Sequence, residues 1–405
     1  MAKPNLKSLS PMAFTKMTPT REEHINAASS QKLPTLDSYK ANALAQVLHP
    51  EVQHLLVTDI IIHNADTKSY VLSPNAEKGT TALAWFSAGQ YLSVSLNIGQ
   101  HILTRPYSLS SNPSDVLKGN YMITVKKVRG GLASTYILDR WEIGTEVTAS
   151  APLGNFTYEP LRDAKTIVGI AGGSGITPFR SLAYAIADGL EDTNLILLYG
   201  SRTLADALFT EELQELAAKC PNFRLINVLS EEEAEGYEKG FITSDLIKKY
   251  APEDSYSIFL CGPQAMYEFA DEQIKALSLK SKYIRHELFG EFFNLSKETD
   301  YTAPKTDAVT ITVRQQGTEQ SFTAGINTSI LRSLEAQGIA CPSHCRSGEC
   351  GWCHSKLIEG EIYTPKALDG RREADSVFGY IHPCCSFPLS DIVIEVPPIT
   401  LPISN

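Results

Sequence analysis

Hydrophobic and polar positions alternate differently in four parts of the chain. Residues 1–48 are rich in Ser, Pro and Lys and weakly periodic, so we expect an extended arm with one short helix near residues 36–48. In residues 49–160, short apolar runs are separated by Gly, Asn and Pro, a pattern typical of antiparallel strands. We expect these strands to form a small antiparallel β-barrel, and place them at residues 55–57, 60–62, 91–96, 121–125 and 146–149.

Strand patterns alternate with helical ones between residues 163 and 290. Residues 166–171 form a continuous apolar run, which is typical of a strand buried in a parallel sheet. The alternation predicts a doubly wound α/β domain with a parallel sheet. Its other expected elements are strands at 195–199, 223–228 and 256–260 and helices at 179–187, 211–219 and 263–277.

Residues 291–306 are expected to be a linker, after which short strands return around one helix at residues 329–336. Residues 307–398 are therefore predicted to be a separate α+β domain. The length of 405 residues agrees with this multidomain organisation, since a domain usually has about 100–200 residues.

Charge and composition argue against some classes of function. Asp and Glu outnumber Lys and Arg by 46 to 36, a net charge of −10, which makes nucleic acid a poor partner. No run of about eighteen apolar residues occurs, so no membrane span is expected. The first residues lack the apolar core of a signal peptide. We therefore expect a cytoplasmic protein, in which structural disulfides explain the eight cysteines poorly.

Six of the eight cysteines lie between residues 341 and 385, and three of them have an informative spacing. Cys345, Cys350 and Cys353 form C-x4-C-x2-C, and thirty residues separate Cys353 from the neighbours Cys384 and Cys385. This is the plant-type spacing of a [2Fe–2S] cluster, in which four thiolates bind two irons. Both Cys384 and Cys385 are candidates for the fourth ligand.

Glycines and histidines near these cysteines bear on the choice of metal. Gly348 and Gly351 let the backbone approach a cluster closely and direct N–H groups at its sulfurs. A structural zinc site is the alternative, which His344 and His354 keep open, but zinc sites usually pair one C-x2-C with a second close pair. We therefore favour the iron–sulfur cluster and expect Cys341, outside the pattern, to be a packed thiol.

Two short motifs within the expected barrel carry a resemblance to a known family. The runs Arg105-Pro106-Tyr107-Ser108 and Gly131-Leu132-Ala133-Ser134 resemble the R-x-Y-S and G-x-x-S elements of the ferredoxin–NADP reductase superfamily. The resemblance implies a bound flavin, which we interpret as FAD, with FMN as the alternative. The residues expected to bind it are Arg105, Pro106, Tyr107, Ser108, Val125, Gly131 and Ser134.

Each motif has a physical role in such a site. Arg105 supplies a fixed positive fork for a phosphate, and Tyr107 supplies a flat face to cover the flavin ring. Ser108 is expected to hydrogen-bond the region of flavin N5, where hydride arrives, so we assign it a catalytic role. Gly131 to Ser134 open a helix, whose N-terminal N–H groups suit a pyrophosphate.

A glycine-rich turn follows the first strand of the α/β domain. The run from Gly172 to Pro178 resembles the GGxGxTP element of the same superfamily, and its N–H groups suit a pyrophosphate. Cys261-Gly262-Pro263, after a later strand, resembles the CGP element that places a catalytic cysteine beside the nicotinamide. The expected ligands of the nicotinamide cofactor are Gly172, Gly173, Gly175, Thr177, Arg202, Cys261, Gly262 and Pro263.

The choice between NADH and NADPH depends on the end of the second strand of this domain. Ser201 and Arg202 suit a 2′-phosphate, but Asp206 is near and no further basic residue follows until Lys219. We expect NADH, with NADPH as the alternative. Glu287 resembles a family strand end beside the flavin, where it would act as a catalytic proton carrier; a solvated strand end is the alternative.

Residues 307–398 resemble a plant-type ferredoxin, which has a β-grasp fold. In these domains the last cysteine ligand is typically followed, four residues on, by Pro. Pro388 stands four residues after Cys384, so the resemblance selects Cys384 as the fourth ligand. Arg346, beside the cluster, is a candidate for steering an acidic partner. Seven Lys and Arg against eleven Asp and Glu from residue 306 onward give this region a net charge of −4, so the polarity of the partner stays open.

The resemblance covers about residues 50–398 and implies an NAD(P)H:acceptor oxidoreductase. The domain order is that of the reductase components of multicomponent oxygenases and desaturases, and of the NADH oxidoreductase that serves the hybrid-cluster protein. We expect hydride to pass from NAD(P)H to FAD and single electrons to pass through the [2Fe–2S] cluster to a partner protein.

Other functions have particular arguments against them. The electron-transfer subunit of dihydroorotate dehydrogenase has a shorter last cysteine gap, and the sodium-pumping quinone reductase subunit begins with its ferredoxin domain. The alternatives kept are a redox-sensing cluster protein without turnover and a flavin reductase acting on small acceptors. Steady reduction of an artificial acceptor distinguishes turnover from sensing.

Overall fold

The computed structural model describes residues 19–27, 39–99, 101–288 and 295–398, and contacts divide the chain into two units, residues 1–48 and 49–405. In the first unit, residues 19–27 are helical and helix α2 spans Lys40–Leu48. The helix expected near residues 36–48 is thus present from residue 40, while residues 36–38 lie outside the described ranges. The second unit holds the three predicted domains.

The predicted flavin barrel is a curled antiparallel sheet of six strands in the order β4-β3-β6-β1-β2-β5. Its edges approach each other where Leu109 bridges to Ile123. Helix α3 (Leu132–Arg140) packs Ile137 into the core, beside the fully buried rings of Tyr70 and Tyr121. The strands are β1 (Gln53–Asn64), β2 (Thr67–Pro74), β3 (Tyr91–Ile98), β4 (His101–Ser108), β5 (Tyr121–Lys126) and β6 (Glu146–Ala149).

The barrel differs from the expected strand pattern in three places, one of which is β4, which was not among the expected strands. The runs expected at 55–57 and 60–62 are one strand, β1, whose register shifts between Val57 and Asp59. Strand β2 was not expected, because its buried positions include the polar residues Thr67 and Ser69. The Ser69 hydroxyl is hydrogen-bonded to that of Thr124 at 2.8 Å, which removes the cost of burying it. Such a strand shows no apolar alternation in the sequence.

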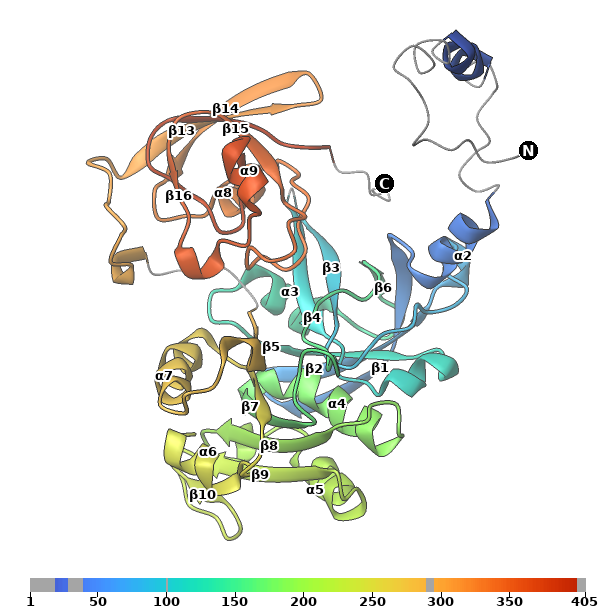
Figure 1. Cartoon of the computed structure of the whole chain (residues 1–405), viewed down its shortest axis with the longest axis vertical. Helices are drawn as coiled ribbons and strands as arrows, with labels where there is room; N and C mark the ends of the chain where they lie inside the picture. The colour runs from blue at the N-terminus through green and yellow to red at the C-terminus, as the bar shows by residue number, and fades with distance from the viewer. Residues whose placement is uncertain (1–18, 28–38, 100, 289–294, 399–405) are drawn as a thin grey trace, which may run out of the picture. The chain divides into compact units, whose positions relative to one another are not determined.

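The predicted doubly wound domain is confirmed as a parallel sheet in the order β10-β9-β8-β7-β11-β12 (Figure 1). Separate clusters of buried side chains cover its two faces, because alternate residues of a buried strand point to opposite sides. Its strands are β7 (Thr166–Gly172), β8 (Asn194–Ser201), β9 (Phe223–Leu229), β10 (Glu238–Lys239), β11 (Tyr256–Cys261) and β12 (Ile284–Glu287). Its helices are α4 (Thr177–Ala187), α5 (Thr210–Lys219), α6 (Ser244–Tyr250) and α7 (Gln264–Lys275).

The C-terminal domain has a mixed five-stranded sheet in the order β14-β13-β19-β15-β17 and a two-stranded sheet β16-β18. Helix α8 packs Ile330, Leu331 and Leu334 into its core with no exposure. The cysteine-rich segment forms a long loop between α8 and β15. The elements are β13 (Ala308–Gln315), β14 (Thr318–Gly325), α8 (Ile330–Ala336), β15 (Ser355–Glu359), β16 (Ile362–Tyr363), α9 (Glu373–Val377), β17 (Tyr380–Ile381), β18 (Phe387–Pro388) and β19 (Ile392–Glu395).

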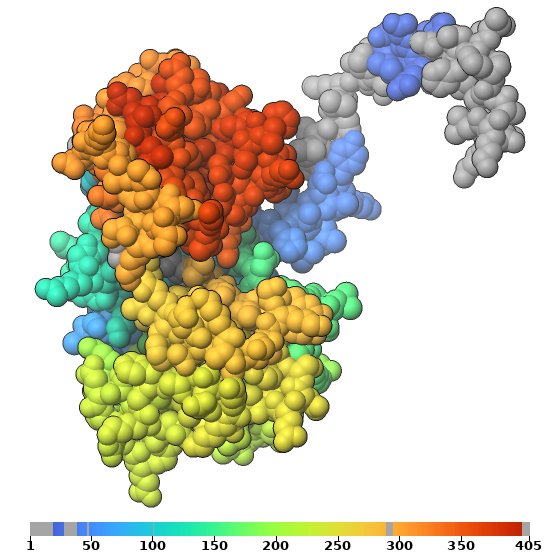
Figure 2. Space-filling view, turned by 60° about the vertical axis from the view of Figure 1, so that its left-hand side comes forward, coloured from blue at the N-terminus to red at the C-terminus, as the bar shows by residue number. Residues whose placement is uncertain are grey.

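Packing within each domain is continuous, and the atoms of the C-terminal domain form one block of orange to red in Figure 2. Phe156, which follows the barrel, packs its ring against Phe179 and Phe259 of the parallel-sheet domain at 5.7 and 5.0 Å between centroids. None of the helices in the described residues is both long and apolar enough to cross a membrane.

Candidate functional site

The four cysteines predicted to bind a [2Fe–2S] cluster form two close pairs. The Cys350 N–H donates to Cys345 Sγ at 3.3 Å, and the Cys353 thiol donates to Cys384 Sγ at 3.4 Å. A hydrogen bond with the Cys350 thiol lowers the pKa of Cys345 to about 6, and the bond from Cys353 likewise lowers the pKa of Cys384. Two close pairs of cysteines match a centre in which two irons are bound by four cysteines.

The backbone of the loop also fits a cluster. Gly348 has φ +87°, and a Cβ there would lie 2.1 Å from the Leu368 carbonyl oxygen, so only glycine is accommodated. The Ser347 N–H donates to Cys345 Sγ at 3.5 Å. Backbone donors aimed at cysteine sulfur are the outer-shell contacts that tune iron–sulfur centres.

The two cysteines outside the chosen set have other contacts. Cys385 Sγ donates to the His382 carbonyl oxygen at 3.5 Å, whereas the adjacent Cys384 faces Cys353. This geometry supports the choice of Cys384. Cys341 is buried in the hydrophobic core of the domain, as expected for a packed thiol.

The surroundings of the histidines weaken the zinc alternative. The His344 ring packs on Trp352 at 4.6 Å, and the His354 ring stacks on Tyr380 at 4.1 Å while its Nε2 contacts Asp375 at 3.2 Å. In the parts of the chain that the structure describes, no group of three or more His, Cys, Asp or Glu is placed to hold one metal ion.

The expectation that Arg346 steers a partner is wrong. Its side chain is 1% exposed and forms a bidentate ion pair with Glu335 of α8, at 2.6 and 2.9 Å. A guanidinium is so rarely buried without a partner that the acidic residue decides its position. Glu335 lies eleven residues earlier in the sequence, and no local pattern links the two.

The flavin motif Arg105 to Ser108 forms the second half of strand β4. The Ser108 hydroxyl is buried and has no protein partner, so it remains available to a polar group of a flavin. Burial raises the pKa of Tyr107, which is half-buried and next to Pro106. Arg105 Nη1 donates to the Thr104 carbonyl oxygen at 2.7 Å.

The second flavin motif begins helix α3 as predicted, with Gly131 as the residue before its first turn. The Val128 N–H donates to Ser134 Oγ at 3.0 Å, so Ser134 holds the turn that leads into the helix. Val125 is fully buried in the barrel core and is paired with Lys68 of β2, so its expected role in binding the flavin stays a prediction.

The two nicotinamide motifs meet at the carboxyl ends of neighbouring strands. Cys261 ends β11 beside Ala171 of β7, and a Cβ on Gly175 would lie 2.1 Å from the Cys261 carbonyl oxygen. A Cβ on Gly172 would lie 2.4 Å from Met266 Sδ. This crevice is where parallel α/β sheets bind nucleotides. Gly173 and Thr177 continue the turn, whose Thr177 hydroxyl donates to the Ser174 carbonyl oxygen at 3.0 Å.

Cys261 and Glu287 lie side by side and are both buried. They are paired in register on β11 and β12, and burial raises the pKa of each side chain. The Tyr267 hydroxyl accepts from the Gly262 N–H at 3.1 Å and donates to the Glu287 carbonyl oxygen, which ties the Gly262-Pro263 turn to β12. Glu287 is therefore not a solvated strand end.

Tyr91 was expected on a strand but not among the site residues. It is 3% exposed on barrel strand β3, in register with Ser108 of the flavin motif. Burial raises its pKa most, followed by the charges of Cys345 and Cys350 of the cluster loop and of Glu287. Groups of the cluster loop and of the nicotinamide site thus lie within electrostatic range of the strand that pairs with the flavin motif.

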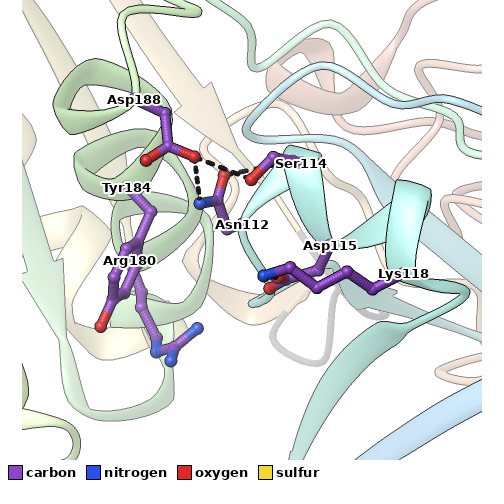
Figure 3. A pocket seen from close by; sticks show the side chains of 7 residues that line it. All are labelled: Asn112, Ser114, Asp115, Lys118, Arg180, Tyr184 and Asp188. Atoms are coloured by element: carbon purple, nitrogen blue, oxygen red, sulfur yellow. Dashed lines mark hydrogen bonds and ion pairs between the residues drawn. The ribbon is translucent and has the colours of Figure 1, made fainter.

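A polar cavity of about 360 Å³ lies elsewhere, between the 3-10 helix Pro113–Lys118 and helix α4. In Figure 3 the Asp188 carboxylate accepts from Asn112 Nδ2 and Ser114 Oγ, each at 2.7 Å. No predicted site residue lines this cavity. Its hydrogen bonds join the barrel domain to helix α4 of the parallel-sheet domain. Its lining residues are Asn112, Ser114, Asp115, Lys118, Arg180, Tyr184 and Asp188.

Comparison with known proteins agrees with this division into domains. Family models match an oxidoreductase FAD-binding domain at residues 54–158, an oxidoreductase NAD-binding domain at 170–272 and a 2Fe-2S iron-sulfur cluster binding domain at 313–389. The ferredoxin reductase component of 3-ketosteroid-9-alpha-monooxygenase from Mycobacterium tuberculosis is 32% identical over 72% of this chain and 79% of the relative. The chain belongs to the ferredoxin–NADP reductase superfamily. In this chain the [2Fe–2S] domain follows the FAD-binding and NAD-binding domains.

Other members of the superfamily match most of the chain. The glycine betaine monooxygenase reductase subunit of Chromohalobacter salexigens is 26% identical over 77% of this chain and 88% of the relative. The solved structure of phthalate dioxygenase reductase covers 85% of this chain and 98% of its own, with a TM-score of 0.61 and 24% identity, and shows the same fold.

The superfamily assignment confirms the expected class and cofactors. The chain is an NAD(P)H-dependent oxidoreductase that uses FAD and a [2Fe–2S] cluster and passes electrons from the nicotinamide cofactor through FAD to the cluster. The Ser108 hydroxyl and the Arg105 guanidinium are groups that suit FAD. The paired cysteines are groups that suit the cluster. The roles of individual residues stay predictions.

The choice of the fourth cluster ligand can be tested directly. Cys384→Ser is expected to remove the visible absorption of the cluster, because the cluster loses one of its four protein thiolates. Cys385→Ser is the matched control and should keep it. Iron content and the visible spectrum measure both; loss of the cluster in Cys385→Ser alone would transfer the assignment to Cys385.

The close approach at Gly175 makes a second prediction. Gly175→Ala should slow the reduction of FAD by NADH by about 100-fold, because the new Cβ must push the turn away from Cys261. The flavin and cluster spectra should be retained. Gly325→Ala, whose Cβ meets nothing closer than 3.7 Å, is the control. Flavin reduction at the wild-type rate in Gly175→Ala would contradict the placement of the nicotinamide.

Proposed function

We propose that this chain is the reductase component of a multicomponent oxygenase, with another protein as its electron acceptor. The relatives named as monooxygenase reductase components share its domain order over most of their length, which supports this class of acceptor. The observation that carries the proposal is that strand β4, which bears the flavin motif, contacts the C-terminal domain: His101 Nδ1 lies 2.8 Å from the Glu335 carbonyl oxygen, and Arg105 Nη1 lies 3.5 Å from Glu335 Oε1.

In this proposal each domain contributes side chains to one reaction path. When bound, FAD takes a hydride from NADH and releases electrons singly, which a [2Fe–2S] cluster accepts. Buried Cys261 would pack beside a bound nicotinamide and exclude water, and the unpartnered Ser108 hydroxyl would be free to hydrogen-bond a flavin near N5. Glu287, whose neutral form burial favours, holds a proton beside this site.

The preference for NADH has support at the end of β8. Arg202 Nη2 is bonded to Asp206 Oδ1 at 3.0 Å, so its charge is already partnered. The Glu231 N–H donates to the Arg202 carbonyl oxygen at 3.0 Å, which places a second acidic residue beside it. A ribose with two free hydroxyls suits this surrounding better than a 2′-phosphate, which acidic side chains repel.

We also propose a cytoplasmic location. All eight cysteines lie within the described residues and all are free thiols, as a reducing compartment favours.

The electron path can be tested by removing the cluster alone. Cys353→Ser protein that keeps its FAD should reduce ferricyanide with NADH at a rate close to wild type. Its reduction of cytochrome c, a one-electron protein acceptor, should fall by about tenfold or more, because the cluster is the proposed exit. Undiminished cytochrome c reduction would show that the flavin serves acceptors directly and would contradict the proposal.

Asp206→Asn tests the cofactor preference. The substitution frees Arg202 to pair with a 2′-phosphate, so kcat/KM for NADPH relative to NADH should rise by about tenfold, the value of one hydrogen bond to a charged group. Glu215→Gln, which removes a more exposed i,i+4 ion pair with Lys219, is the control. If the ratio of kcat/KM for NADPH to that for NADH were unchanged in Asp206→Asn, the proposed position of the adenine ribose beside Arg202 would be contradicted.

A further inference from the structure

The carboxylate of Glu335 lies between two guanidinium groups from different domains. On one side it holds Arg346 of the cluster loop through both oxygens, at 2.6 and 2.9 Å. On the other side its Oε1 lies 3.5 Å from Nη1 of Arg105, on the flavin-binding strand β4. Glu335 and Arg346 are 6% and 1% exposed, so their pair is shielded from water.

Two further contacts join the same strand to the same part of the C-terminal domain. His101 Nδ1, at the start of β4, donates to the backbone carbonyl oxygen of Glu335 at 2.8 Å. The Thr104 hydroxyl is hydrogen-bonded to the hydroxyl of Ser343, which lies two residues before Cys345. Strand β4 therefore contacts both the end of α8 and the start of the cluster loop.

The positions of these residues in the sequence connect the two cofactor sites. Arg346 directly follows Cys345, and its backbone is left-handed with φ +62°, a conformation that needs support from its surroundings. Arg105 is followed at once by Pro106, Tyr107 and Ser108 of the flavin motif. The Glu335 carboxylate thus contacts both the residue after a cluster ligand and the first residue of the flavin motif.

The charges do not cancel within this group. Two guanidinium groups around one carboxylate leave one net positive charge. This charge lies at Arg105, whose guanidinium we assign to a flavin phosphate. A buried ion pair contributes little to stability by itself, since its desolvation offsets the attraction, so its best-supported use is to specify one arrangement among several.

We propose that Glu335 is a positioning residue that fixes the cluster loop against the flavin-binding strand, through Arg346 on one side and Arg105 on the other. It acts on the rate at which electrons pass from flavin to cluster and not on the hydride step. The expected effect on the rate of electron transfer rests on the proposed function. The expected effect on structure rests only on the contacts between β4 and the C-terminal domain.

The test needs a variant that still folds. Glu335→Gln leaves Arg346 buried without a counter-charge, which can unfold the domain. The double variant Glu335→Leu, Arg346→Met removes both charges together and replaces them with apolar groups of similar size, so the net charge is unchanged. Glu319→Gln, in an exposed ion pair with Arg314 on the β13–β14 hairpin, is the control.

Two measurements on the holoprotein distinguish positioning from a local effect. In anaerobic stopped-flow with NADH, flavin reduction in the double variant should match wild type, while cluster reduction should slow by about tenfold or more, since displacement of a reacting pair by an ångström is costly. In hydrogen exchange, the amides of β4 should lose protection while those of β13 and β19 keep theirs.

Cluster reduction at the wild-type rate would overturn the proposal. Slow cluster reduction with unchanged exchange in β4 would also overturn it, because the effect would then be confined to the loop. If NADH failed to reduce the cluster even in wild type, the proposed function would be rejected, and the docking role of Glu335 would be decided by the exchange of β4 alone.

Discussion

The ion pair between Arg346 and Glu335 is the constraint on which the cluster half of the site depends. Because arginine stays protonated, a guanidinium that is 1% exposed strongly destabilises the fold unless a carboxylate lies against it. Once the pair forms, the residue after Cys345 has one position, and the loop that carries three of the four cysteines begins there. The third member, Arg105, extends the same constraint to the strand with the flavin motif.

The nicotinamide half depends on a different constraint, which is steric. The glycine-rich turn and the Cys261-Gly262-Pro263 turn approach so closely that a single methyl group on Gly175 would overlap the Cys261 carbonyl. Parallel strands end at the same edge of a sheet, so β7 and β11 bring both turns into one crevice. Glu287 joins them because β12 is the next strand along. Charge pairing on one side and backbone contact on the other thus bring groups of two other domains within electrostatic range of Tyr91.

The features that could be predicted from sequence are those whose chemistry is local. Cysteine spacing around Cys345 and the glycine turn at Gly172 each encode a loop and its ligand within about ten residues. The buried run at β7 indicated a parallel sheet for the same reason. Strand β2 was missed because hydrogen-bonded Ser69 and Thr67 replace apolar residues inside the barrel.

Long-range partners account for the other differences. Arg346 looked like a surface charge because nothing nearby in the sequence shows that α8 presents Glu335 to it. Tyr91 looked like an ordinary strand residue, since Cys345 and Glu287, whose charges act on it, come from two other domains. Both residues become informative only when the fold brings distant segments together.

The central claim is that electrons from NADH reach the [2Fe–2S] cluster through the flavin of the same chain. An anaerobic titration of the purified protein with NADH, followed by its visible spectrum, tests this most directly. The account predicts that the flavin bands and the cluster absorption both bleach at low NADH. A flavin that bleaches while the cluster absorption stays unchanged would contradict it.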